Sequence, residues 1–580
     1  MTTSWTASNS RNTANITSGT IGGAPVATLL GGIDPRNPFY GAKVDGQAVY
    51  DAVIALVSGT TYSVSSATAN FSANDVSKVF GSIAKSSGQQ YGYHGTVSQF
   101  VSTGQIYITC ANSGVVSSAS IFVWGTDDSA ALNAAITAAA ASVPQSPVII
   151  PLGIMTLAPA APITFPNGVT PVGIQNTTVI DPIANMSYGG SCMVLCSYLG
   201  GSPFVELGTV ANPHYVGSNI RNVTVDAMGQ AASAVYDNQV EAEHTLCTFL
   251  HGTGTTLNTN QGAVVEQCRI TGTDQQATLS MTGDCRVQNN YVHGAGANYP
   301  CIVMSGTDMT LVNNHMWRDS DTNPLGDGIL LNLNDGGNVD GAITIGGANK
   351  FDSINGSPVN ITITNNTTVR VINIVANHAF ANDATQNYPS AVCSTANIAI
   401  ANSSSQIAVA AISSGLVQGS NGTATSNSSG TIYIGQVVSG TNIPANTRII
   451  AQVSGTPGGA GTYTMSANAT GTSSGTYNFI GNPFVILNIA AGSTLRMLRI
   501  SDNTGMGSLS TATKSPWANL VDGTNVKGTL LAMDVSGNDF DDMGAGYGSS
   551  GTGTSLLAST TPSGRNVLIV NSASTAPVAF

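Results

Sequence analysis

The stretch Trp124–Gly125–Thr126–Asp127–Asp128–Ser129–Ala130–Ala131–Leu132–Asn133–Ala134–Ala135–Ile136 gives the clearest indication of the fold. Its two adjacent carboxylates suit the unpaired N–H groups at the start of a helix. Leu132 and Ile136 then lie one turn apart on one helix face, and Pro144 ends the helix. The apolar stretch Pro147–Leu157 follows, interrupted by proline and glycine. The sequence therefore predicts a short alanine-rich helix that leads into a β-strand.

A second stretch upstream, Phe39–Tyr40–Gly41–Ala42–Lys43–Val44–Asp45–Gly46, belongs with the first. Together they resemble the beginning of pectate-lyase-like right-handed parallel β-helix proteins of the bacteriophage tailspike and tail-fibre type. Val44 departs from the family's usual opening, where a glycine is more typical. The resemblance implies an all-β fold, a right-handed parallel β-helix (solenoid) with a short N-terminal capping helix. It carries no catalytic group.

The composition favours a β-rich protein with a polar, mostly uncharged surface. Only 8% of the 580 residues are charged, whereas 42% are hydrophobic, which is too many for a disordered chain. A net charge of −12, with 17 scattered Lys and Arg residues, argues against nucleic-acid binding. No stretch approaches the roughly 18 apolar residues of a membrane span. The N-terminus lacks the basic and apolar regions of a signal peptide, so we expect a virion tail component, extracellular after lysis.

The eight cysteines show no metal-ligand spacing, and several fall on strand-like stretches. We expect buried, reduced thiols rather than disulfides, because a free cysteine behaves as a small buried hydrophobe. The sequence predicts no metal site and no cofactor.

Two strand-rich segments interrupt the predicted solenoid. Alternation over Gln105–Cys110 indicates a half-buried strand inside a segment that separates the two halves of the opening. A later segment, rich in Gly, Ser and Thr, contains further alternating strands. The predicted organisation is an N-terminal virion-attachment segment (1–38), the start of the β-helix (39–56), an inserted small β domain (57–122), the capping helix and main β-helix (123–400), an inserted β module (401–481) and C-terminal coils with a tail (482–580).

An internal repeat supports the solenoid. Cys285–His293 aligns with Met309–Trp317 at an offset of 24 residues, and Ala263–Thr271 precedes the first of them by 22. Such periods suit one coil of a parallel β-helix, with coils about 4.8 Å apart. The apolar parity shifts at the Asn289–Asn290 and Asn313–Asn314 pairs, which predicts a bend there, since Asn tolerates left-handed conformations. Stacked side-chain amides would then bond from coil to coil.

The repeat places a group of aromatic and basic side chains outward. Trp317 is predicted beside His293, and His315 beside Tyr291. Aromatic rings cover the apolar faces of sugars while Arg and His supply hydrogen bonds, so this group is suited to glycan contact. Packing against a neighbouring subunit or loop is the alternative. The candidate glycan-binding residues are Arg269, Tyr291, His293, His315, Trp317 and Arg318.

Two groups of carboxylates are candidates for catalysis. On one strand face, Glu241 and Glu243 would lie about 6.5–7 Å apart, within the range of inverting glycosidases. Acids on an exposed strand also serve solubility. The loop acids Asp319, Asp321 and Asp327 are suited either to the same chemistry or to Ca²⁺, although a proline stands where a calcium loop has its glycine.

These observations leave three hypotheses. The first is a tailspike-like protein that contacts bacterial surface polysaccharide. The second is a polysaccharide depolymerase, a glycoside hydrolase using paired carboxylates, so the sequence leaves enzymatic activity undecided. The third is a purely structural virion protein. The resemblance further implies a homotrimer that joins other virion tail proteins through its N-terminus, without nucleic acid and without membrane insertion.

Overall fold

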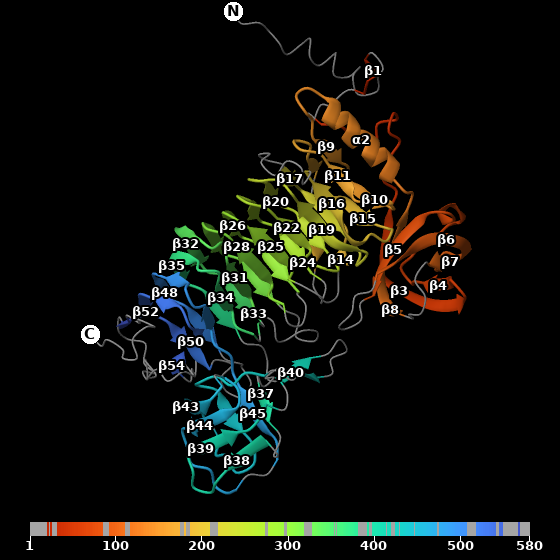
Figure 1. Cartoon of the computed structure of the whole chain (residues 1–580). Coiled ribbons are helices and arrows are strands. Elements are labelled where there is room, and N and C mark those ends of the chain that lie inside the picture. The colour runs from red at the N-terminus through yellow and green to blue at the C-terminus, as the bar shows by residue number, and fades with distance from the viewer. Residues whose placement is uncertain are drawn as a thin grey trace, which may run out of the picture. The chain divides into compact units, whose positions relative to one another are not determined.

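The computed structural model describes most of the chain as two compact units, residues 1–273 with 278–280 and residues 274–277 with 281–580 (Figure 1). Each unit is considered by itself. The described residues are 32–84, 92–110, 117–174, 188–208, 219–272, 277–294, 299–317, 327–352, 354, 356–380, 391–393, 397–412, 430–445, 447–456, 458–472, 475–506 and 518–540, with short strands at 20–21, 24–25, 179–180, 186–187, 415–418, 424–427, 545–548 and 566–568.

Each coil of the first unit contains three strands, and each strand pairs in parallel with its counterpart in the next coil. The first strands are β9 (Val148–Ile150), β12 (Pro171–Gly173), β17 (Asn219–Arg221), β20 (Glu243–Thr245) and β23 (Val264–Glu266). The second strands are β10 (Gly153–Leu157), β15 (Ser191–Leu195), β18 (Val223–Asp226), β21 (Thr248–Leu250) and β24 (Arg269–Thr271). The third strands are β11 (Ile163–Phe165), β16 (Gly200–Leu207), β19 (Ala231–Asp237) and β22 (Leu257–Thr259). β25 (Leu279–Thr282) contributes to both units.

The second unit repeats the same plan. Its first strands are β26 (Cys285–Gln288), β29 (Met309–Val312), β32 (Asn338–Gly346), β35 (Thr368–Val375), β47 (Thr494–Leu495), β48 (Leu498–Ser501), β51 (Thr529–Leu530) and β52 (Met533–Ser536). The second strands are β27 (Tyr291–His293), β30 (His315–Trp317), β33 (Lys350–Asp352), β36 (His378–Phe380), β49 (Thr504–Met506) and β53 (Asp539–Phe540). The third strands are β28 (Ile302–Ser305), β31 (Ile329–Leu333), β34 (Val359–Ile363), β46 (Val485–Ile489), β50 (Asn519–Val526) and β54 (Ala545–Gly548).

In both units the core is a stack of apolar side chains. Parallel in-register pairing places Val225, Phe249 and Ile270 above one another in the first unit, all at 0% exposure. Met316 and Phe351 stack in the same way in the second unit. Alternate residues therefore point outward, which makes each sheet a surface of regularly spaced side chains. The predicted right-handed parallel β-helix is confirmed.

The segment before the helix forms a closed barrel that contains the predicted 57–122 insert and begins earlier, at Gln47. Its strands, in spatial order, are β3 (Gln47–Ser58), β4 (Thr61–Ser65), β7 (Gln105–Cys110), β6 (Gly92–Ser102), β5 (Val79–Ala84) and β8 (Ser117–Gly125), with a 3-10 turn η1 (Ala73–Asp75). Its core includes the aromatic rings of Tyr62, Phe80, Phe122 and Trp124. The barrel therefore has a hydrophobic core of its own.

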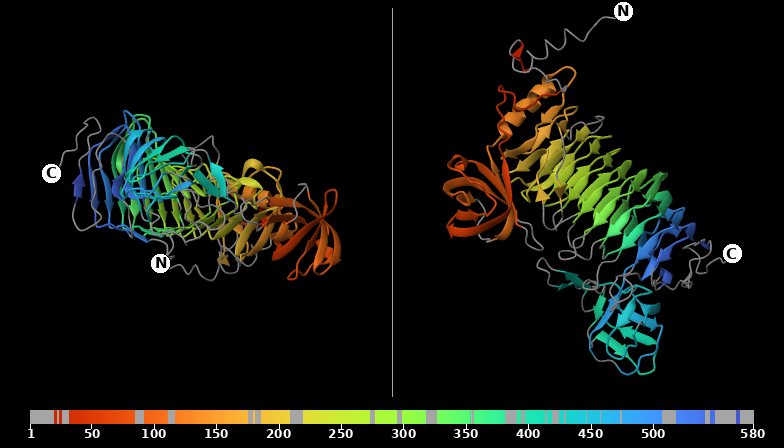
Figure 2. Two further views of the ribbon diagram at one scale, coloured as in Figure 1. Left: turned by 90° about the horizontal axis from the view of Figure 1, so that it is seen from below. Right: turned by 180° about the vertical axis from the view of Figure 1, so that it is seen from behind.

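The barrel is packed closely against the first coils (Figures 1 and 2). Its Ile83 and Val123 share an apolar cluster with Cys192, Val194 and Met228 of the coils. A side chain on Gly92 of β6 would overlap the backbone and side chain of residues 228 and 230, so glycine is needed for this close approach.

Under the barrel lies a buried polar group centred on Asp226. His251 Nδ1 lies 2.9 Å from Asp226 Oδ1, and the Tyr188 hydroxyl and the Met228 N–H both donate to this carboxylate. Burial and the Asp226 charge raise the pKa of Tyr188 well above its usual value. The Tyr188 N–H also donates to the hydroxyl of Tyr50 in β3 of the barrel at 2.7 Å, so this enclosed group connects the coils to the barrel.

The two halves of the interrupted opening meet again at the start of the helix α2 (Ser129–Ala141). Asp127 Oδ1 accepts from the Ser129 N–H (3.0 Å), as a helix start requires, whereas Asp128 accepts from the N–H groups of Lys43 (2.7 Å) and Val44 (2.9 Å). The predicted helix is confirmed. The strand predicted over 147–157 is instead two strands, β9 and β10, with a corner between them.

The position where the family resemblance called for glycine is strained in this chain. Val44 has φ +52°, a left-handed conformation that is unfavourable for a β-branched residue. We expect Val44→Gly to raise the free energy of unfolding by about 0.5–1 kcal/mol, since strain removed exceeds backbone freedom gained. Thermal unfolding of the purified variant measures this. Val53→Gly, in extended strand β3, is the control and should lower the midpoint; a lower midpoint for Val44→Gly as well would refute the explanation.

The second inserted module separates β36 from β46 of one coil. It contains a three-stranded sheet, β37 (Ala391–Cys393), β45 (Tyr477–Ile480) and β42 (Val437–Ser439), and a four-stranded sheet, β38 (Ile398–Ile400), β39 (Gln406–Val409), β44 (Gly461–Met465) and β43 (Ile449–Gly455). A hairpin, β40 (Gly415–Gln418) with β41 (Ala424–Asn427), accompanies them. Tyr463, Tyr477 and Phe479 form its core, so the Gly/Ser-rich composition encodes a folded module.

The small remaining strands are β1 (Thr20–Ile21) with β2 (Ala24–Pro25), β13 (Val179–Ile180) with β14 (Met186–Ser187), and β55 (Asn566–Leu568), which is antiparallel to β52. All eight cysteines are buried thiols outside any disulfide, as the sequence predicted. None of the helices in the described residues is long and apolar enough to cross a bilayer.

Candidate functional site

The candidate surface is held in place by the bend between the first and second strands of each coil. In the second unit, Asn289 (φ +59°) and Asn313 (φ +52°) adopt the predicted left-handed conformation. The Asn that follows each of them points inward, and Asn290 Nδ2 donates to Asn314 Oδ1 at 3.0 Å. The predicted amide stacking between coils is therefore confirmed.

The stack of amides is longer than the sequence suggested. Asn314 Nδ2 lies 3.1 Å from Asn349 Oδ1, Asn349 Nδ2 donates to Asn377 Oδ1 at 3.0 Å, and Asn377 Nδ2 donates to Asn503 Oδ1 at 2.8 Å. Asn503 continues it to Asn538. We call these six residues the asparagine ladder. Each stands immediately before a second strand, a sequence signal that would have revealed them, and together they fix the register of the outward side chains.

Two columns of outward side chains follow from this register. The first column is Tyr291, His315, Lys350, His378 and Thr504, and the second begins His293, Trp317, Asp352. The predicted pairings of Tyr291 with His315 and of His293 with Trp317 are confirmed. Lys350, Asp352 and His378 were missed. We call the two columns together the second-strand patch.

The aromatic rings of the patch are in mutual contact. The ring centroids of His293 and Trp317 are 4.4 Å apart and nearly parallel, and those of Tyr291 and His315 are 4.9 Å apart, edge to face. His293 is buried, whereas Tyr291, His315 and Trp317 are half-buried. Because His293 covers one face of Trp317, only the remaining surface of the indole is open to a sugar ring.

A carboxylate orders the polar side chains beside these rings. Asp352 Oδ2 lies 3.4 Å from both His315 Nε2 and Lys350 Nζ, and His378 Nδ1 lies 2.7 Å from Thr504 Oγ1. The aromatic rings of the first two coils and the polar side chains of the coils that follow thus extend along about 19 Å of the sheet, four steps of about 4.8 Å. This combination suits a polyhydroxylated ligand that extends along the coils.

Two candidate glycan-binding residues remain, Arg269 and Arg318. Arg269 is half-buried in β24 of the first unit, whereas the patch belongs to the second. Arg318, Asp319 and Asp321 lie outside the described residues.

The two glutamates are both exposed, but they do not lie on one strand. β20 begins at Glu243, and Glu241 lies in the preceding turn with φ +55°. The expectation of a shared strand face was therefore wrong at Glu241, because the chain turns there to start a new coil. The close titratable pair of this segment is internal: His244 Nε2 lies 3.0 Å from Asp237 Oδ2, with both side chains at 0% exposure.

Asp327, the described member of the predicted acidic loop, stands beside the second inserted module. Its Oδ1 accepts from the Ser357 N–H (2.8 Å) and its Oδ2 from Asn360 Nδ2 (2.9 Å). Burial, and then the charges of Asp522 and Asp327, raise the pKa of Tyr433 from the module well above its usual value. Two carboxylates thus lie near one phenol. The sequence could not reveal this, since the three residues come from distant segments.

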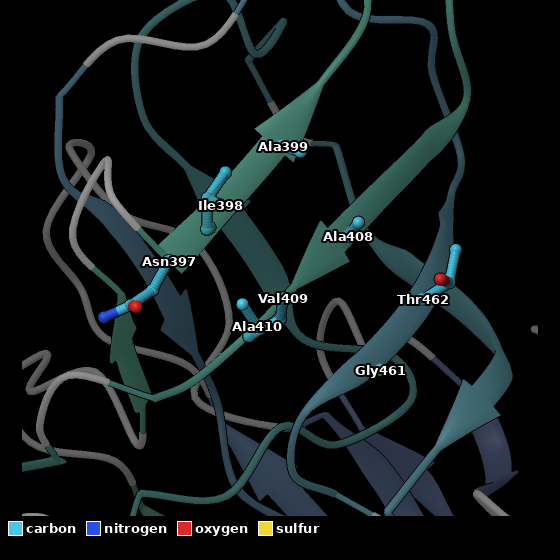
Figure 3. Close-up of a pocket in the computed structure, with 8 residues that line it drawn as sticks. All are labelled: Asn397, Ile398, Ala399, Ala408, Val409, Ala410, Gly461 and Thr462. Atoms are coloured by element: carbon cyan, nitrogen blue, oxygen red, sulfur yellow. The ribbon is translucent and has the colours of Figure 1, made fainter.

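The module carries a pocket of about 290 Å³ on its four-stranded sheet (Figure 3). Its small lining residues Ala399, Ala408 and Gly461 leave the hollow, and its eight lining residues include no charged side chain. The pocket therefore offers no charged side chain for acid–base catalysis. In the part of the chain that the structure describes, no group of three or more His, Cys, Asp or Glu side chains is placed to hold a metal ion.

No protein-family model and no curated protein matches the chain. Among solved structures it is similar to the A-module of the mannuronan C-5 epimerase AlgE4 of Azotobacter vinelandii (14% identity, TM-score 0.32, 73% of this chain and 96% of that chain). It is also similar to the tailspike protein gp49 of Pseudomonas phage LKA1 (10% identity, TM-score 0.19, 75% and 81%) and to the DFA-IIIase of Arthrobacter chlorophenolicus A6 in complex with GF2 (12% identity, TM-score 0.28, 45% and 78%). Likenesses this distant do not carry a function.

Proposed function

We propose that this protein is a tailspike-like virion protein that binds bacterial surface polysaccharide through the second-strand patch. The single observation that supports this is the pair of columns on successive coils, with Trp317 and Tyr291 beside the oriented donors His315 and Lys350. Trimer formation and attachment to other tail proteins through the N-terminal segment belong to the same proposal.

A repeating ligand fits a repeating surface. Because the outward side chains recur at each coil, successive sugars of one chain would meet equivalent positions of the sheet. Because the chain has few charges, hydrogen bonds and aromatic contact would contribute much of the affinity. The interaction would be shallow and extended, and its strength would come from several sugars bound at once.

The test is binding of the labelled whole chain to bacterial cells before and after enzymatic or chemical removal of surface polysaccharide. We expect saturable binding that is lost when the polysaccharide is removed and is inhibited by the purified polymer. Binding that survives removal, or that follows a surface protein instead, would refute the proposal. Size analysis of the polymer after incubation distinguishes binding from cleavage.

A second candidate function is cleavage of the same polymer, favoured by the position of Asp327 and Asp522 near Tyr433. A pair of carboxylates of which one donates a proton and the other acts as base or nucleophile is what glycoside hydrolysis requires. Asp327 accepts a hydrogen bond at each of its two carboxylate oxygens. In this hypothesis it is the base, and Asp522 at 3% exposure is the acid.

For this candidate we expect Asp327→Asn to lower the rate of polymer shortening at least about hundredfold. The measurement is size-exclusion chromatography of the polysaccharide over time. Asp335→Asn, at an exposed position just after β31, is the matched control and should leave the rate unchanged. Intact polymer with the unaltered protein would remove the enzyme hypothesis and leave the binding proposal standing.

A further inference from the structure

The basic residues of this chain are unevenly distributed over the coils. Three of its seven histidines, His293, His315 and His378, occupy outward positions in β27, β30 and β36, and Lys350 occupies β33 between them. Lys350 is the only lysine between positions 85 and 514. In a protein of net charge −12, four successive strands therefore carry a concentrated set of cationic and donor groups.

One carboxylate lies next to these basic groups and contacts two of them. Asp352 lies in the second column, where it is 3.4 Å from both His315 Nε2 and Lys350 Nζ. This carboxylate orients both donors while the Lys350 side chain keeps 44% of its area exposed. The other titratable group on these strands is Tyr291, next to His315. Asp539, in the first column two coils beyond His378, is exposed.

In the first column, Lys350 and His378 place partly exposed side chains on adjacent coils. Lys350 pairs in register with His378, so their side chains are neighbours about 4.8 Å apart. When the Thr504 hydroxyl donates to His378 Nδ1, the ring proton stands on Nε2, which is then a donor as well. An ammonium beside an imidazole N–H is suited to a carboxylate oxygen pair.

We infer that the polysaccharide bound by the second-strand patch is acidic, and that Lys350 and His378 receive a sugar carboxylate, as in a uronic or sialic acid unit. This inference rests on the proposed function and specifies its ligand. Tyr291 and Trp317 contact the sugar rings, whereas Lys350 and His378 select for the charge. A neutral polymer would leave the Lys350 ammonium without an anionic partner from the ligand.

The experiment uses the whole chain and a panel of purified bacterial capsular polysaccharides, acidic and neutral, in which each carboxylated polymer is paired with its carboxyl-reduced form. We expect binding to carboxylated members only, loss of binding on carboxyl reduction, and weaker binding as salt rises. Lys350→Gln should weaken binding of the carboxylated polymer about tenfold or more. Lys527→Gln removes an exposed lysine at the end of β50 and should change nothing.

The possible results distinguish a ligand that is not acidic from a protein that does not bind polysaccharide. Binding that persists after carboxyl reduction, or that includes neutral polymers equally, overturns the inference and leaves glycan binding intact. Binding of sulfated or phosphorylated polymers without carboxylates also overturns it, because the anion would then be of another kind. If no member of the panel binds, both the inference and the proposed function fall. An unchanged affinity in Lys350→Gln contradicts the assignment of the charged position.

Discussion

Replacing Asn349 by alanine is expected to lower the free energy of unfolding of the second unit by about 4 kcal/mol. The side chain is at 0% exposure and stands in the middle of the asparagine ladder. Its Nδ2, with two hydrogens, lies within hydrogen-bonding distance of Leu311 O (2.8 Å), Gly346 O (2.9 Å) and Asn377 Oδ1 (3.0 Å). Its Oδ1 accepts from the Asn314 N–H (2.9 Å). Alanine leaves several of these buried groups without partners, at about 1–3 kcal/mol each.

The measurement is the rate of unfolding after a jump into denaturant, together with the equilibrium midpoint. Asn373→Ala is the matched control, since this half-buried residue has one long contact, to Thr344 Oγ1 at 3.5 Å, and should lose less than about 1 kcal/mol. Asn349→Asp tests the same point differently, because it keeps the shape, removes the amide donors and buries a charge. Equal losses for Asn349→Ala and Asn373→Ala would contradict a special contribution of the ladder.

The second large effect is on binding: Trp317→Ala should weaken the affinity for polysaccharide about thirtyfold, or about 2 kcal/mol. Trp317 is central to the patch, with its ring centroid 4.4 Å from that of His293 and 6.4 Å from that of Tyr291. Truncation removes the largest ring of the patch and exposes His293. Because the side chain points outward, the thermal midpoint should change little.

Titration of labelled protein against the purified polymer, or against whole cells, measures this loss. Tyr236→Ala is the control, since Tyr236 is 41% exposed on β19, a third strand of the first unit, and contributes nothing to the patch. Trp317→Phe should retain part of the affinity because it keeps an aromatic surface. An unchanged affinity in Trp317→Ala would place the binding surface elsewhere on the molecule.

The sequence predicted the bends and outward pairs wherever one coil had the same length as the next. Asn290 and Asn314 are 24 residues apart, so a fixed offset found Tyr291 with His315 and His293 with Trp317. The next ladder steps, to Asn349 and Asn377, span 35 and 28 residues. A bend and its second strand are fixed by backbone geometry, whereas the connections after it vary in length. Periodic alignment therefore missed Lys350, Asp352 and His378.

Other features depend on contacts between distant segments. The approach of Asp522 and Asp327 to Tyr433 needs the second inserted module to be in place, and no local pattern encodes it. The strand face expected for Glu241 and Glu243 failed for a related reason. Spacing alone predicts alternation along a strand, but it does not locate the left-handed turn, here at Glu241, where the strand has not yet begun.

The barrel leaves and rejoins the chain at almost the same point. Thr126 N–H and hydroxyl both bond to Asp45, and a side chain on Gly125 would lie 2.8 Å from Gly46 Cα. Because the two ends of the barrel are this close together, recombination can replace the barrel by another domain. The coils that follow it would keep their positions. The replacement domain would still have to cover the apolar side chains of Cys192, Val194 and Met228. The coils thus determine the apolar surface that an inserted domain must cover, whereas the inserted domain itself can vary.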